Sequence, residues 1–163
     1  MGHPRPTPEP TPPGLNSRRA TLRDAAYFST RLRAADLQEL EHSSGSDPLT
    51  ALLRSVRLST QSWVAEWEGE PVCLFGVMED AFDEERGIIW LVGTDDVERL
   101  QRPFLRTARR WFDGLSSRYG ELANAVWSGN ALHLRWLKWM GAELGEPVPH
   151  PHSQALFVPF RYV

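Results

Sequence analysis

Few side chains in this sequence could perform acid–base chemistry, and they lie far apart. His133 is in an amphipathic segment, and histidine is the side chain that most often exchanges protons near neutral pH. Three glutamates, Glu66, Glu68 and Glu79, lie in segments with strand character, and each could act as a general base. A histidine without an acidic partner is usually structural, however, and carboxylates on strands usually face solvent. We therefore predict no catalytic residue from these side chains.

Signatures of metal sites, cofactor sites and nucleophiles are equally weak. His150 and His152 lie close together, but no cysteine or acidic cluster accompanies them, so we predict no metal site. The single cysteine, Cys73, excludes an internal disulfide. The sequence contains no Walker loop, no dinucleotide-binding fingerprint and no serine or cysteine nucleophile motif. We accordingly predict no cofactor-binding residue.

The composition is typical of a packed domain that is made in a cytoplasm. Hydrophobic residues make up 41% of the chain and include seven Trp and seven Phe, which is enough for a core. The net charge is −3, whereas nucleic-acid-binding domains are usually basic, so we expect no sequence-specific nucleic-acid partner. No apolar run approaches the roughly 18 residues that span a bilayer, and the N-terminus lacks a secretion signal. We expect no membrane partner.

Turn and cap residues divide the first half of the folded region into short elements. Asp24 and Asp47 are suitable helix N-caps, and Pro48 occupies the favoured first helical position. Gly69 marks the turn of a hairpin. The predicted elements are a strand at 20–23, helices at 24–33 and 35–42, a helix that begins at Pro48, and strands at 62–68 and 71–78.

The second half alternates strands and helices. A buried strand at 87–93 precedes a long helix that places Phe104, Trp111, Phe112 and Leu115 on one face. Arg106, Arg109, Arg110 and Asp113 occupy the opposite face, which we interpret as solvated rather than as a phosphate-binding surface. A strand at 122–127 follows, then a helix capped by Asn130 and ended by Gly141, then strands near 143 and at 155–162. This order predicts an α/β (α+β) domain with a mixed sheet and helices on both faces.

Residues 1–18 differ in composition from the rest of the chain. Six of the first 17 residues are prolines, and proline fits neither a helix interior nor a central strand. The sequence therefore predicts an extended Pro-rich arm at 1–18 and a folded domain at 19–163. We expect the arm to serve as a strap that contacts another subunit, because proline reduces the entropy that is lost on docking.

Two stretches carry a resemblance to known families. Residues 130–141 (NALHLRWLKWMG), directly after a strand, resemble the Asn, amphipathic helix and Gly unit near the end of GNAT-type acyltransferases. Residues 124–130 (NAVWSGN) and 90–95 (WLVGTD), with the helices that follow them, are similar to the internal core protein A family of podophages. That family consists of virion-associated proteins related to GNAT domains. The resemblance covers about residues 19–146 and implies a mostly antiparallel, GNAT-like sheet.

The resemblance to acyltransferases implies three functional features, and the sequence departs from at least two of them. A Gly-rich turn should hold the acyl-CoA pyrophosphate, but residues 93–103 (GTDDVERLQRP) bring three carboxylates and a proline to that place. A tyrosine seven residues after the Asn should be the general acid, but Leu137 stands there. A general base on the central strands cannot be singled out among Glu66, Glu68 and Glu79.

The function that the resemblance implies is a structural one. We expect a structural or assembly component of a short-tailed phage virion, in the internal core or head-to-tail region. Its partners would be other virion proteins. An assembly of several symmetric copies is one arrangement that this role allows. No cofactor is expected in this role. The alternative is an active N-acetyltransferase that uses acetyl-CoA to modify a host or phage amine.

Overall fold

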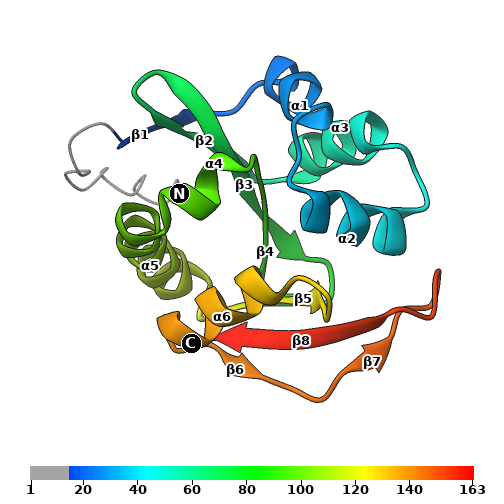
Figure 1. The fold of residues 1–163 in the computed structure, drawn as a ribbon. Helices are drawn as coiled ribbons and strands as arrows, with labels where there is room; N and C mark the ends of the chain where they lie inside the picture. The colour runs from blue at the N-terminus through cyan, green and yellow to red at the C-terminus, as the bar shows by residue number, and fades with distance from the viewer. Residues whose placement is uncertain (1–14) are drawn as a thin grey trace.

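A computed structural model describes residues 15–163; residues 1–14 lie outside the described part. Eight strands form one sheet in the order β1-β2-β3-β4-β5-β8-β6, with β7 paired to β8 (Figure 1). The strands are β1 (Leu15–Arg19), β2 (Gln61–Trp67), β3 (Glu70–Asp80), β4 (Asp83–Gly93), β5 (Glu121–Trp127), β6 (Glu143–Leu144), β7 (Val148–Pro149) and β8 (Leu156–Tyr162). The helices are α1 (Leu22–Ser29), α2 (Ala34–Ser44), α3 (Pro48–Leu58), α4 (Asp96–Arg99), α5 (Gln101–Tyr119) and α6 (Ala131–Met140).

The two central strands of the sheet separate along their length. All other neighbouring strands are antiparallel, but β4 and β5 are parallel and pair only from Arg86↔Glu121 to Ile88↔Ala123. Beyond that point the strands diverge (Figure 1). The Asn124 side chain bridges the point of divergence, because its Nδ2 donates to the Ile89 carbonyl at 2.7 Å. The facing edges of β4 and β5 therefore have backbone groups that are not paired with each other.

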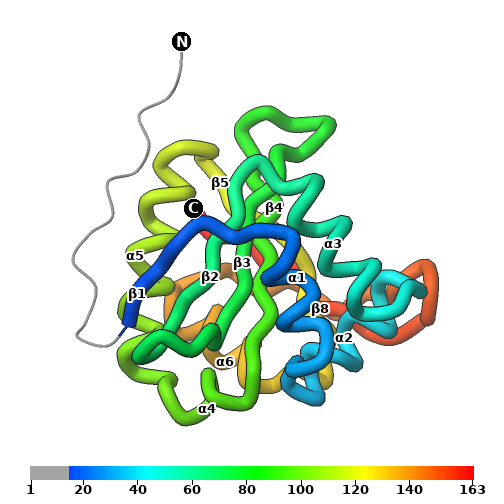
Figure 2. The backbone as a smooth tube through the Cα atoms, turned by 90° about the horizontal axis from the view of Figure 1, so that it is seen from above, coloured from blue at the N-terminus to red at the C-terminus, as the bar shows by residue number. Residues whose placement is uncertain are grey.

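Helices cover both faces of the sheet, as the sequence predicts. On one face α1, α2 and α3 enclose a cluster built on Phe28, Leu52, Val64 and Leu74. On the other face α5 and α6 cover a larger cluster that includes Phe75 and the inner side chains of both helices. Figure 2 shows these two groups of helices on opposite sides of the strands. The alternation of strand side chains between two cores confirms the predicted mixed α/β architecture.

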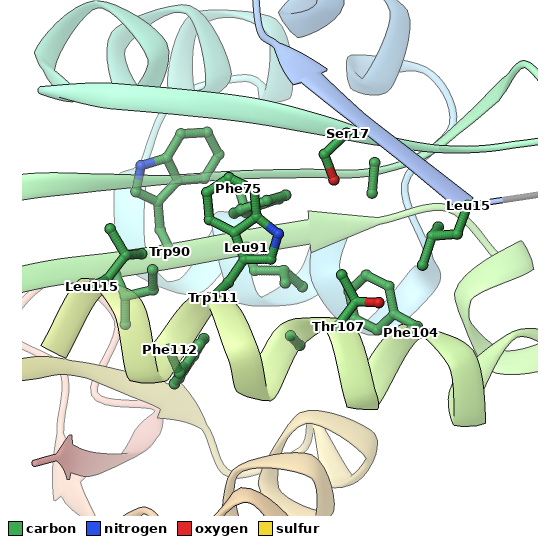
Figure 3. Close-up of a pocket in the computed structure, with 13 residues that line it drawn as sticks. Leu15, Ser17, Phe75, Trp90, Leu91, Phe104, Thr107, Trp111, Phe112 and Leu115 are labelled. Atoms are coloured by element: carbon green, nitrogen blue, oxygen red, sulfur yellow. The ribbon is translucent and has the colours of Figure 1, made fainter. Parts of the chain in front are cut away.

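The inner face of α5 packs closely on the sheet. Trp111 contacts the ring of Phe75, with the two centroids 5.3 Å apart (Figure 3). It also contacts the ring of Trp63, with the centroids 4.6 Å apart. A cavity of only about 30 Å³ remains there, lined almost entirely by apolar side chains that include Leu15 of β1 and Phe104 of α5. This volume is close to that of a single water molecule, so the region is core rather than a ligand site.

Local signals predicted some helix ends correctly and others not. Asp47 accepts the Thr50 N–H at 2.9 Å at the start of α3, and Gly141 ends α6 in the left-handed conformation, so both predictions are confirmed. The prediction that Asp24 is an N-cap is wrong: Thr21 caps α1, and Asp24 is the third helical residue, where its carboxylate accepts the Thr21 N–H. A capping box satisfies two N–H groups at once, which favours this register.

The first strand also begins earlier than predicted. Residues 20–23 were expected to form it, but β1 is Leu15–Arg19, which pairs with β2 from Leu15↔Trp67 to Arg19↔Trp63. Leu15 is buried, which explains why the strand reaches back to it. The last four residues of the predicted arm thus lie in the sheet. The remainder, residues 1–14, lies outside the described residues, and the division into arm and domain stays a prediction.

Candidate functional site

A cavity of about 330 Å³ lies where β4 and β5 diverge. It is lined by residues 89–92 of β4 and 124–126 of β5, and by side chains from α2, α3, α5 and α6. Most of the lining is apolar, but Glu39 and His133 also face it. We call this space the splay cavity. Its size suits a small organic ligand, so it is the candidate site of this fold.

Helix α2 bridges the two diverging strands at one end of the splay cavity. Asp36 Oδ2 accepts the backbone N–H of Gly93, the last residue of β4, at 2.8 Å. One helical turn later, Glu39 Oε1 accepts the backbone N–H of Trp127, the last residue of β5, also at 2.8 Å. The Arg33 N–H completes the bridge by donating to the Gly93 carbonyl at 2.9 Å. We call Arg33, Asp36 and Glu39 the α2 clasp. They form hydrogen bonds with backbone groups that the divergence of the strands leaves unpaired.

The charges of the α2 clasp are buried and compensated. The Arg33 side chain is only 4% exposed, and its guanidinium donates to Asp36 Oδ1 at 3.0 Å. It also contacts Glu98 of α4 at 3.2 Å. Asp36 is 1% exposed and accepts a further bond from Asn130 Nδ2 at 3.0 Å. Buried ions with several well-placed partners hold elements in one arrangement, so the clasp fixes α2 against β4 and α6.

Asn130 and His133 belong to this network. Asn130 is completely buried, and its side chain makes no cap bond, although the sequence predicts it as an N-cap. Its amide instead reaches Asp36 and His133 Nδ1, the latter at 3.1 Å. Since Nδ1 accepts this bond, the proton of a neutral ring lies on Nε2, which is 3.5 Å from Asp36 Oδ1. Burial lowers the pKa of His133, so the ring is poorly suited to donate a proton at neutral pH as a general acid.

The turn after β4 offers an anion few free backbone donors. A short helix, α4, occupies the place where a Gly-rich loop would be expected. Backbone N–H groups along this turn already donate to protein oxygens: those of Gly93, Thr94, Val97, Glu98 and Leu100. Asp95 and Glu98 are exposed beside them. A diphosphate at this turn would thus meet carboxylates and occupied donors.

The structure does not bring the predicted glutamates to the splay cavity. Glu66 pairs with Arg18 on the outer strands, Glu68 lies in the β2–β3 turn, and Glu79 is exposed near the β3–β4 turn. Leu137 does line the cavity and offers no proton. Glu39 was missed, because its place in α2 carries no local signal of a contact 88 residues away.

His150 lines the splay cavity, whereas His152 lies beside Gly45 at the end of α2, and neither is bonded to the α2 clasp. The His152 N–H donates to His150 Nδ1 at 3.1 Å, and the His150 ring packs on Phe157. Within residues 15–163, no three His, Cys, Asp or Glu side chains form a group that could hold a metal ion. None of the described helices is long and apolar enough to cross a membrane.

Glu39 should make stability depend on pH. Desolvation of its carboxyl raises the pKa from 4.5 to about 7, although the Trp127 N–H opposes the effect. The folded state therefore binds this proton more tightly than the unfolded state, so Glu39 lowers stability as the pH rises from about 4.5 to 7. Glu39→Gln keeps an acceptor for Trp127 and removes the charge. We expect this substitution to leave the free energy of unfolding nearly unchanged at pH 4.5. At pH 8 it should raise that free energy by at most about 3 kcal/mol.

Urea unfolding of the two proteins across this pH range would measure the difference. Glu41→Gln, at an exposed position of the same helix, is the matched control and should show no such trend. A stabilisation by Glu39→Gln that is equal at pH 4.5 and pH 8 would contradict the assignment, because it could not arise from the ionisation of Glu39.

The arrangement of strands around the splay cavity is that of the GNAT acetyltransferases. The chain superposes on an acetyltransferase of the GNAT family from Bacillus anthracis with a TM-score of 0.66 and 10% identity, covering 91% of this chain and 94% of that one. Spermidine N-acetyltransferase from Vibrio cholerae, in complex with CoA and spermine, gives a TM-score of 0.66 at 11% identity, covering 92% and 95%. Ribosomal-protein-alanine N-acetyltransferase from Brucella melitensis gives 0.64 at 12%, covering 91% and 99%. The predicted GNAT-like fold is confirmed; identities this low show the fold alone.

Sequence similarity points to phage proteins. Residues 81–147 match the family described as "Bacteriophage T7, probable scaffold protein Gp13". The chain is also 38% identical over 72 residues to the probable scaffold protein gp13 of Escherichia phage T7. That alignment covers 42% of this chain and 52% of the relative, so it spans about half of the relative's length. The matches confirm the resemblance to a phage core or scaffold family, in the second half of the predicted stretch.

Proposed function

We propose that this protein is a structural or assembly component of a short-tailed phage virion, in its internal core or head-to-tail region. The similarity of residues 81–147 to a phage scaffold protein family is the observation that carries the proposal. The GNAT fold then serves as a stable module for contacts with other virion proteins. The protein would be synthesised in the host cytoplasm and then enter the particle.

The geometry of the α2 clasp supports a role without acyl transfer. Asp36 and Arg33 occupy both backbone groups at the end of β4, and Asp95 and Glu98 place negative charge at the turn that follows. Leu137 replaces the expected proton donor. We propose accordingly that the protein has no catalytic, cofactor-binding or metal-binding residues and uses no cofactor.

An acetyltransferase is the second candidate, and one observation favours it. The splay cavity persists between β4 and β5 at about 330 Å³, and Glu39 and His133 face it. With a pKa of about 7, Glu39 would be able to exchange a proton near neutral pH. Acetyl-CoA would be the cofactor in that case.

Calorimetric titration with acetyl-CoA separates the two candidates. We expect no measurable binding, since the backbone donors of the turn are occupied and carboxylates surround them. Asp95→Asn/Glu98→Gln removes two of the three carboxylate charges of the turn but leaves the N–H groups engaged, so this variant should not bind either. A micromolar dissociation constant for the native protein would contradict the structural role, and binding by the variant alone would show that charge repulsion was the sole obstacle.

A mass-spectrometric inventory of purified particles tests the structural role directly. The native chain should be present in the particles, and a protein found only in the infected cell would contradict the proposal. A variant that lacks residues 2–14 tests the proposed strap in the same experiment. We expect it to fold with an unchanged melting temperature and to enter particles less efficiently, because the arm would contact a neighbouring subunit. Equal incorporation would exclude that contact.

A further inference from the structure

The surface of α5 and α6 is strongly basic, although the chain as a whole is acidic. These two helices contain seven Arg or Lys residues and one carboxylate, Asp113, whereas the whole chain has a net charge of −3. Trp139 is 51% exposed among these cations, and the Arg109 guanidinium lies 5.8 Å from its ring centroid. We call this surface the basic face; its exposed side chains are Arg102, Arg106, Arg109, Arg135, Lys138 and Trp139.

The tip of the β3–β4 hairpin has the opposite character. Residues 79–85 contain five carboxylates and no Arg or Lys, and Phe82 at their centre is 99% exposed. The tip is ordered by its own side chains: Asp80 accepts the Phe82 N–H at 2.9 Å, and Asp83 accepts the Glu85 N–H at 3.0 Å. We call residues 79–85 the acidic tip. A fully exposed aromatic ring on an ordered turn within a charged rim resembles the anchor of a protein interface.

The acidic tip and the first cations of the basic face lie at opposite ends of one strand. The acidic tip contains Asp83, where β4 begins, whereas α4 and the first two turns of α5, with Arg102 and Arg106, follow Gly93, where β4 ends. Eleven residues of strand extend over about 33 Å. Figure 2 shows the β3–β4 hairpin projecting at one end of the molecule and α4 at the other. The acidic tip is therefore too far from Arg102 and Arg106 to bind them within its own molecule.

We propose that copies of this chain associate head to tail, with the acidic tip of one copy bound to the basic face of the next. Complementary charges steer such contacts, and Phe82 would pack beside Trp139. Two different surfaces on one chain make a heterologous interface, which closes into a ring when the rotation between copies permits. A nucleic acid is a less suitable occupant of the basic face, because the acidic tip and the net negative charge would repel its phosphates. The proposal deepens the proposed structural role, but purified protein is enough to test it.

Sedimentation velocity over a broad concentration range would detect the association. We expect species heavier than the 18.5 kDa monomer at about 0.1 M salt, and the monomer alone at about 1 M salt, where the screening length falls to about 3 Å. Phe82→Ala should weaken the association without changing its dependence on salt. A native protein that stays monomeric at the lower salt and at every concentration would overturn the proposal.

A charge-reversal pair tests the two surfaces against each other. Glu79→Lys/Glu84→Lys reduces the net charge of the acidic tip from −5 to −1, and Arg102→Glu/Arg106→Glu reduces that of the five exposed cations of the basic face from +5 to +1. Each variant alone should be monomeric, and the equimolar mixture should associate again, which a misfolded variant could not do. Association of either variant alone would overturn the proposed contact. A monomeric native protein that binds DNA, and loses that binding in the Arg102→Glu/Arg106→Glu variant, would assign the basic face to nucleic acid instead. Particle incorporation is measured separately, so failure here leaves the virion role intact.

Discussion

Replacing Trp136 with alanine is expected to lower the free energy of unfolding by about 3–5 kcal/mol, the usual cost of removing a buried Trp. Trp136 is 5% exposed, and its ring lies 5.2 Å from that of Phe104 in α5 and 5.3 Å from that of His133. The side chain therefore joins α6 to α5 beside the splay cavity. Its removal would enlarge that cavity and separate α6 from its main apolar partner.

Trp139 provides the matched control for this substitution. It is on the same helix, three residues later, but is 51% exposed and contacts Arg109 through its ring. Trp139→Ala should cost about 1 kcal/mol or less, the scale of an exposed cation–π contact. Urea unfolding of both variants would give the comparison. Equal losses would mean that the two rings are equally buried in solution, contrary to the structure.

Asp36→Ala is the second substitution for which we expect a large loss, of about 3–5 kcal/mol. It leaves the buried Arg33 guanidinium with only the largely exposed Glu98 as a counterion, at 3.2 Å. It also removes the acceptors of the Gly93 N–H and the Asn130 amide. Because the removal of one partner from a buried ion pair costs more than the removal of both, Arg33→Met/Asp36→Leu should be more stable than Asp36→Ala.

Urea unfolding and hydrogen exchange together test this prediction. In Asp36→Ala the Gly93 amide should exchange faster than in the native protein, because its acceptor has been lost. Glu41→Ala, at an exposed position on α2, is the control and should change neither stability nor exchange by a measurable amount. If the double variant were less stable than Asp36→Ala, the ion pair would be a net source of stability, and the argument from uncompensated charge would be wrong.

Much of the local structure could be read from the sequence. Asp47 before Pro48 marked the start of α3, and Gly141 marked the end of α6, because each signal acts over a few residues. The periodicity of apolar residues correctly placed Phe104, Phe112 and Leu115 on the buried face of α5. The N-cap of α1 was misplaced by three residues, because Thr21 and Asp24 form a capping box. The first strand was misplaced by five residues, because its register is decided by pairing with β2, which lies more than 40 residues later in the chain.

The candidate site depended on contacts that no short stretch of sequence encodes. The acidic turn after β4 and the apolar residue at 137 are visible in the chain, and they sufficed to argue against acyl-CoA binding. The bonds from Asp36 to Gly93, from Glu39 to Trp127 and from Asn130 to Asp36 join residues 57, 88 and 94 positions apart. Only the tertiary structure brings these groups together, because the divergence of β4 and β5 leaves backbone donors unpaired and burial makes their pairing obligatory. For the same reason Asn130 lies at the N-cap position of α6, as predicted, but its side chain makes no cap bond and instead links α6 to Asp36 of α2.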